Sequence, residues 1–296
     1  MWKAVLPAVI ALVTLGLSLV SGEAVKRESE HKQVVALAQP AEPAKAKVAD
    51  PITTATTPHA SGHPVALVIG NSAYPDAGLP LAQPVNNARA LAATLKDKGF
   101  DVELGENLTR QAMEDAFESF KSKIEPGSTA LIFFSGFGVQ AGRQTYMLPI
   151  NAHIWNEADV RRTGVSLEPL LSEIDAKGAG AKVVILDASR RNPFERRFRS
   201  VSAGLAAIQA PDDTLIMYAA APGKVVSDSE GELSPLTDEL IGQIRTSGQS
   251  AEAVFKRTRL AVSNASHREQ VPWVSSSLVE DFSFTAAPGK VQQSAR

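Results

Sequence analysis

The sequence predicts an α/β protein, a three-layer sandwich in which a mostly parallel sheet carries helices on both faces. Short aliphatic segments recur along the chain, and segments with apolar residues at helical spacing separate them. Several aliphatic segments end abruptly in polar residues, as where residues 183–186 meet Asp187. Such segments are typical of strands buried on both faces of a parallel sheet, and the regular alternation with helices favours that arrangement.

Six segments are predicted to be strands of this sheet. They are residues 65–69, 100–104, 130–134, 183–186, 214–219 and 278–284. The last of them alternates apolar and polar residues, so we expect it at the edge of the sheet. A small hairpin is expected between Gln140 and Leu148, with Gly142 in its turn.

The predicted helices carry recognisable start and stop signals. Pro84 lies near the start of the first helix and Gly99 follows its end, and Thr109, Ser166 and Ser250 are expected to cap three others. The expected helices are residues 84–98, the segment that follows Thr109 up to Ile124, the segment from Ser166 to about 176, and residues 236–244 and 250–263.

The N-terminal part of the chain differs from the rest. Residues 1–24 combine an early lysine, an apolar run over residues 4–20 and small residues after it, which is the layout of a secretory signal peptide or an uncleaved signal anchor. Residues 25–64 lack helical or strand periodicity and predict a disordered linker. We therefore expect an exported protein, periplasmic or secreted, or one anchored in the inner membrane by residues 4–20.

The amino-acid composition excludes several kinds of functional site. The chain of 296 residues contains no cysteine, which excludes disulfides, cysteine-ligated zinc and a cysteine nucleophile. Its formal net charge of -2 gives no basic field for nucleic acid, so no nucleic-acid partner is expected. A cluster of arginines between Arg190 and Arg199 is expected to be a solvated loop rather than a partner-binding patch.

Two of the predicted strands are followed by loops that are expected to lie at the same edge of the sheet. Gly136-Phe137-Gly138 follows the strand at residues 130–134, and Asp187-Ala188-Ser189 follows the strand at residues 183–186. The carboxyl ends of parallel strands carry the functional site in open α/β sheets. We therefore expect these two loops to form the candidate site.

These loops and several other fragments resemble the caspase-like cysteine peptidases of the C14 type, in particular the bacterial metacaspase relatives called orthocaspases and their p20 domain. The matching fragments occur in the order that the family has. They are residues 65–74 (VALVIGNSAY), 84–89 (PVNNAR), 133–140 (FFSGFGVQ), 186–194 (LDASRRNPF), 218–223 (YAAAPG) and 272–278 (PWVSSSL).

The resemblance implies a fold and a domain division. It implies a six-stranded, mainly parallel sheet within a caspase-like domain at residues 65–284. This domain would divide into a large portion at 65–190, a connecting loop at 190–213 and a small portion at 214–284, followed by a tail at 285–296.

The resemblance also implies that both reacting groups are replaced. The family places its general-base histidine at the position of Phe137 and its cysteine nucleophile at the position of Ser189. A phenyl ring accepts no proton, and a serine hydroxyl is a poor nucleophile without an adjacent base. We therefore expect a catalytically inactive domain, a pseudoenzyme that binds peptides or partner proteins.

The sequence keeps acidic residues at positions that the resemblance links to substrate specificity. The resemblance assigns Asp187, and Asp228 in a loop bordering the pocket, to a pocket that binds an arginine or lysine side chain. An alternative is that Asp187 only caps local backbone N–H groups. Relatives also bind calcium through acidic clusters, but the sequence locates no equivalent cluster, and no other cofactor is expected.

Two alternative functions stay open at this stage. Ser189 could be the nucleophile of a rewired peptidase whose base is another histidine, such as His153 or His267. The domain could instead be a purely structural or interaction domain with an empty groove.

Overall fold

The computed structural model describes residues 62–77, 80–194, 204–227, 229–246 and 248–284. The expected signal segment at residues 1–24, almost all of the expected linker, the tail at 285–296 and Asp228 lie outside the described residues. Among the described residues, no helix is both long enough and apolar enough to cross a membrane.

A six-stranded sheet forms the centre of the described structure, as predicted. Its strand order is β2-β1-β3-β7-β8-β9, and all neighbours are parallel except β8 and β9. The strands are β1 (Val65–Gly70), β2 (Asp101–Glu106), β3 (Thr129–Ser135), β7 (Ala181–Asp187), β8 (Thr214–Tyr218) and β9 (Trp273–Ser276).

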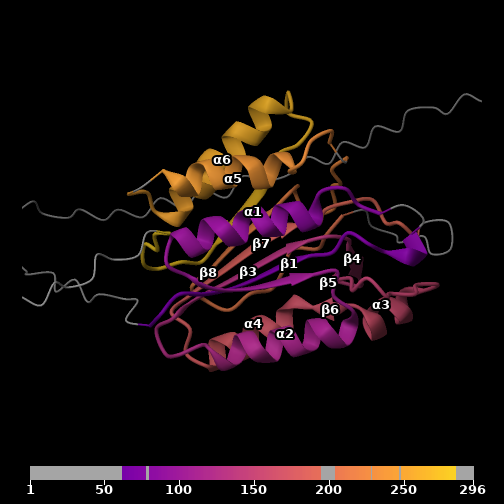
Figure 1. The fold of residues 1–296 in the computed structure, drawn as a ribbon, viewed down its shortest axis with the longest axis horizontal. Coiled ribbons are helices and arrows are strands. Elements are labelled where there is room, and N and C mark those ends of the chain that lie inside the picture. The colour runs from indigo at the N-terminus through magenta and orange to yellow at the C-terminus, as the bar shows by residue number, and fades with distance from the viewer. Residues whose placement is uncertain (1–61, 78–79, 195–203, 228, 247, 285–296) are drawn as a thin grey trace, which may run out of the picture. The chain divides into compact units, whose positions relative to one another are not determined.

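Helices cover both faces of this sheet (Figure 1), which confirms the predicted fold class. One face carries α1 (Pro84–Asp97), α5 (Pro235–Arg245) and α6 (Ala251–Ala265), and the other carries α2 (Arg110–Ser122) and α4 (Leu167–Ala176). Side chains alternate along β1: Leu67 and Ile69 pack toward α2 and α4, whereas Ala66 and Val68 pack toward α1. Two apolar cores therefore lie on opposite faces of one sheet.

The predicted caps are mostly confirmed. The side chains of Thr109 and Ser250 accept hydrogen bonds from the backbone N–H groups of Ala112 and Ala253 at the starts of α2 and α6. Ser166 does precede α4, but its hydroxyl donates to the Glu168 carboxylate instead of capping the helix.

A second, smaller sheet lies beside the carboxyl ends of the central strands. The predicted hairpin is confirmed as β4 (Gly138–Ala141) paired antiparallel with β5 (Gln144–Met147), and β6 (Val165–Ser166) adds a third strand. The short helix α3 (Glu157–Thr163) and the 3-10 turn at Pro75–Ala77 were not predicted. Only Val160 of α3 is buried, so its sequence has no apolar stripe to mark it as a helix.

The prediction of a last strand at residues 278–284 is wrong. The edge strand is β9 at Trp273–Ser276, and residues 278–284 form only an isolated bridge between Ser250 and Ser283. Their alternation has a different cause. Phe282 and Phe284 pack against the core beneath α1 and α6, and Val279 is 84% exposed. The alternation of apolar and polar residues therefore comes from a segment that packs on the core and is not part of a strand ladder.

The carboxylate of Asp187, the last residue of β7, ties the sheet to two helices. It is 2% exposed and accepts hydrogen bonds from Asn87 Nδ2 of α1 (2.9 Å), from Thr237 Oγ1 of α5 (3.2 Å) and from the Ser234 hydroxyl. Ser234 caps α5, and its backbone N–H donates to Asn87 Oδ1 at 2.9 Å. The carboxylate also lies at the N-terminus of α5, where the helix dipole favours a negative charge.

Replacing Asp187 with alanine should destabilise the whole domain. Three donors would be left buried without their acceptor, so we expect a loss of about 3 kcal/mol in the free energy of unfolding. Urea unfolding of the purified protein measures it. Asp97→Ala, at the exposed end of α1, is the matched control and should change stability by less than about 0.5 kcal/mol. Equal stability of the two variants would contradict the anchoring role.

Truncating Phe284 should also be costly, although it lies outside any strand. Its ring is 3% exposed and packs against Phe282 at 5.2 Å and Phe255 at 6.3 Å between ring centroids. We expect Phe284→Ala to cost about 3 kcal/mol in the same unfolding experiment. Val279→Ala in the same segment should be nearly neutral. A negligible effect of Phe284→Ala would mean that the segment is not part of the core.

Candidate functional site

The two predicted loops lie side by side at the carboxyl ends of β3 and β7. Ser135 is the register partner of Asp187. Beyond the strands, the Gly136 N–H donates to the Asp187 carbonyl at 3.4 Å and the Gly138 N–H donates to the Ala188 carbonyl at 3.2 Å. The two sequence-distant loops therefore lie against each other at one edge of the sheet, and their role as a site stays a prediction.

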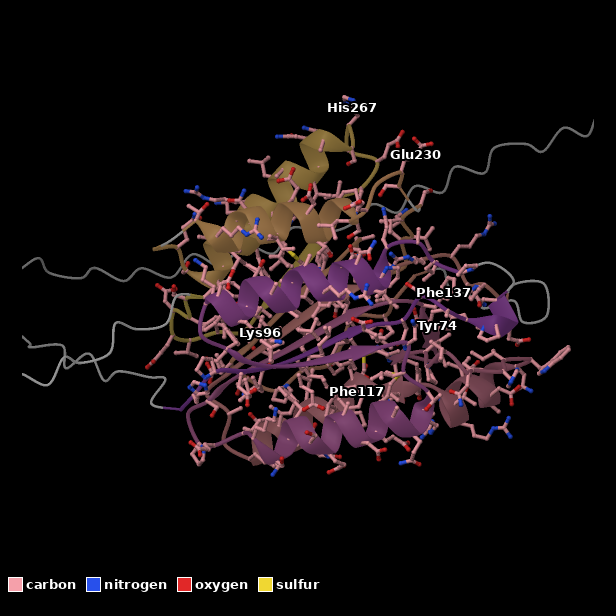
Figure 2. All side chains as sticks on the ribbon, in the orientation of Figure 1. Tyr74, Lys96, Phe117, Phe137, Glu230 and His267 are labelled. Atoms are coloured by element: carbon pink, nitrogen blue, oxygen red, sulfur yellow. The ribbon has the colours of Figure 1, made fainter. Side chains whose placement is uncertain are left out.

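Phe137 is packed into an aromatic cluster and presents no polar group. Its side chain is 6% exposed and meets the ring of Tyr74 edge-on, with centroids 4.9 Å apart (Figure 2). The Tyr74 hydroxyl accepts a hydrogen bond from the Phe137 N–H (3.1 Å) and donates to the Leu148 carbonyl (3.0 Å). Burial raises the pKa of Tyr74 well above its usual value, so the hydroxyl keeps its proton and serves as a structural bridge.

Ser189 is buried and its hydroxyl has no hydrogen-bond partner among the described residues. The residue is 1% exposed, and its carbonyl accepts from the Val226 N–H at 2.8 Å, which fixes the backbone of this loop. A serine nucleophile needs a base within hydrogen-bond reach to remove its proton. None of the described groups meets that requirement.

The histidines proposed for a rewired site lie elsewhere. His153 is on the surface, with a side chain 71% exposed and Nδ1 at 3.5 Å from Asp76 Oδ2. His267 lies beyond the end of α6, far from Phe137 (Figure 2). Neither forms a hydrogen bond to Ser189.

Apolar side chains fill the space around the two loops. A Cβ atom added at Gly138 would come within 2.6 Å of Leu205 Cδ2, so Leu205 lies directly against this glycine. Leu205 is 1% exposed, and Phe194, which is 2% exposed, belongs to the same apolar cluster as Phe137 and Tyr74. Both residues belong to the expected connecting loop at residues 190–213. The site is therefore closed by the chain's own segments.

Hydrogen bonds hold the second of these segments in place. The Leu205 carbonyl accepts from the Gly223 N–H at 3.0 Å, and the Ala206 carbonyl accepts from Thr145 Oγ1 at 3.1 Å. Tyr218 Oη accepts from the Ile208 N–H at 2.9 Å, and burial raises the pKa of Tyr218 to about 12. The segment is thus tied both to β8 and to the small hairpin.

The basic-residue pocket predicted at Asp187 and Asp228 stays a prediction. Asn87, Ser234 and Thr237 all donate to Oδ2 of the Asp187 carboxylate, and Arg190 Nη1 lies 3.8 Å from its Oδ1. An incoming guanidinium would have to reach a residue that is only 2% exposed. The alternative of a cap on backbone N–H groups also differs from what is observed, because the partners are side chains of α1 and α5.

The residues that support the site were not singled out from the sequence. Tyr74, Asn87 and Asn71 lie within two of the fragments that carry the family resemblance, and that was the only available signal. Asn71 joins the loops by donating to the Leu148 carbonyl (3.1 Å) and accepting from the Leu108 N–H (2.8 Å). Their roles depend on contacts distant in sequence, which residue patterns do not record.

No cation site is evident in the described part of the chain. It contains no group of three His, Asp or Glu side chains that could hold a metal ion. A cavity of about 980 Å³ lies at the opposite end of the sheet, near the amino ends of the strands, and is lined among others by Lys98, Thr129, Ala181 and Phe284. It includes none of the residues of the two loops.

Comparison with known proteins agrees with the architecture. A search of curated proteins found no match. The model of the caspase domain, peptidase C14, matches residues 63–283. A match of this extent, on a parallel sheet whose strand ends bring Phe137 and Ser189 together, shows that the chain belongs to the caspase-domain family and that it does so without any cysteine.

Proposed function

We propose that this protein is a non-catalytic member of the caspase-domain family that acts by binding partner proteins. One observation carries the proposal: Ser189, at the position that the resemblance assigns to the family nucleophile, has a buried hydroxyl with no hydrogen-bond partner among the described residues. The proposal includes export from the cytoplasm, which is supported only by the apolar run at residues 4–20.

The peptidase chemistry lacks both of its reacting groups. Attack on a peptide carbonyl requires a deprotonated nucleophile, and Ser189 lacks a base. The residue proposed to lie at the position of the base, Phe137, cannot accept a proton, and its ring packs against Tyr74. Members of a catalytic pair act as a unit, so loss of both partners removes nearly all of the rate enhancement.

The closed groove favours recognition through outer surfaces over recognition of a peptide between the two loops. Leu205 and Phe194 occupy the space near Gly138 and Phe137 that an extended peptide would need. Recognition of an arginine or lysine side chain at Asp187 is the finer version of the proposal, and it requires the connecting segment to move. Calorimetry with arginine-containing peptides tests this version. It is supported if the unmodified protein gives a heat of binding and the Asp187→Asn variant, which removes the charge, stays folded but gives none.

Closure of the site can be measured through a single engineered thiol. Because the chain has no cysteine, Ser189→Cys carries one thiol, and its rate of alkylation by a maleimide reports access to this position. Ser275→Cys on the exposed side of β9 is the matched control. We expect the Ser189→Cys thiol to react at least about tenfold more slowly, because local opening must come first. Equal rates would show an open groove.

The peptidase assay addresses the activity itself. Purified full-length protein should show no turnover of fluorogenic peptides with arginine or lysine at the cleavage position, with or without calcium. Turnover that Ser189→Ala abolishes would establish a rewired serine peptidase instead. We expect the double variant Phe137→His/Ser189→Cys to stay inactive as well, because Leu205 still lies on Gly138. Recovered activity would mean that only the reacting groups separate this domain from an active peptidase.

A further inference from the structure

Ion pairing is unevenly distributed over the described chain. The ion pairs seen between described residues involve arginine and lysine side chains of the first part of the domain. They are Arg89, Arg110, Lys121, Lys123, Arg161, Arg162, Lys182 and Arg190. Within the described residues, the cations in and just after α6 form no such pair. They are Lys256, Arg257, Arg259 and Arg268.

These cations surround exposed apolar side chains. Leu260 is 61% exposed and lies on the solvent face of α6, one turn after Lys256 and Arg257. Trp273 at the start of β9 is 42% exposed, and the guanidinium of Arg259 lies 5.8 Å from the centre of its ring. We call Lys256, Arg257, Arg259, Leu260, Arg268 and Trp273 the α6 face.

The α6 face lies on the exposed side of a helix at the periphery of the described domain. The opposite side of the helix is buried through Val254, Phe255 and Val262, and α6 lies at the rim of the layer that also contains α1 and α5 (Figure 1). Two acidic residues nearby, Glu252 and Glu269, offset part of its positive charge, but the four cations of the α6 face outnumber them. The cavity described above includes no residue of the α6 face.

We propose that the α6 face binds the surface of a lipid bilayer that carries anionic headgroups. Lysine and arginine around an exposed leucine and tryptophan are the combination that attaches helices to a membrane interface. The cations contribute through attraction to the headgroups, at about fivefold in affinity for each. The exposed leucine and tryptophan favour a bilayer over an acidic peptide, because apolar side chains can enter the boundary between headgroups and acyl chains. The inference is independent of the lost peptidase chemistry.

Vesicle flotation with the full chain tests this proposal. Vesicles of phosphatidylcholine alone are compared with vesicles in which a third of the lipid is phosphatidylglycerol. The test variant is Lys256→Glu/Arg257→Glu, and its matched control is Arg143→Glu/Lys177→Glu, two exposed cations that form no ion pair in the described structure. The expected apolar run at residues 4–20 is the same in every protein, so differences between variants report the α6 face alone.

We expect the unmodified chain and the Arg143/Lys177 variant to float with the anionic vesicles, and the Lys256/Arg257 variant to bind them at least about tenfold more weakly. Leu260→Ser should weaken binding without any change in charge. Raising the salt concentration should remove most of the anionic preference, because exposed charges are screened. Thermal unfolding checks that each variant stays folded.

Three outcomes would overturn the proposal. One is equal binding to neutral and anionic vesicles, and another is equal loss in the test variant and its control. The third is binding of an oligoglutamate peptide that depends on Lys256 and Arg257 when vesicle binding does not, which would identify an acidic protein segment as the partner.

Discussion

A single buried carboxylate holds the functional end of this domain together. Asp187 ends β7, and its side chain receives donors from α1 and α5, which are separated from it by about fifty to one hundred residues of sequence. A buried carboxylate is tolerated only when its lone pairs are satisfied, so its partners Asn87, Ser234 and Thr237 are fixed with it. This constraint places the start of α5 against the sheet and sets where the loop containing Ser189 begins.

The same constraint separates the residues that the fold needs from those that only chemistry needs. Asp187 keeps the identity expected from the family resemblance, and it has structural partners on two helices. Ser189 has no hydrogen-bond partner for its side chain, and Phe137 contributes only apolar packing against Tyr74. The resemblance places the cysteine and the histidine of the family at these positions. The sheet, the caps and the Asp187 network are formed with serine and phenylalanine there.

Much of the fold could be predicted from the sequence because its central strands are buried on both faces. Segments such as residues 65–69 and 183–186 are continuous aliphatic runs, and the helices between them carry apolar stripes and caps. The wrong strand at residues 278–284 and the missed helix α3 share a cause. Phe282 and Phe284 alternate with other residues because they pack on a core, so the periodicity wrongly indicates a strand. Helix α3 has little apolar surface, so no periodicity marks it as a helix.

The sequence predicts where the two loops of the candidate site lie, but not which segment of the chain covers them. Adjacent loops at Phe137 and Ser189 follow from strand ends in a parallel sheet, whereas the contact of Leu205 with Gly138 depends on the path of a long connection. Leu205 and Phe194 are buried against the two loops, so their side chains add only apolar contacts there. The cations that we propose to bind a membrane lie on a different element, α6. That helix packs beside α5, whose start is held by the Asp187 network.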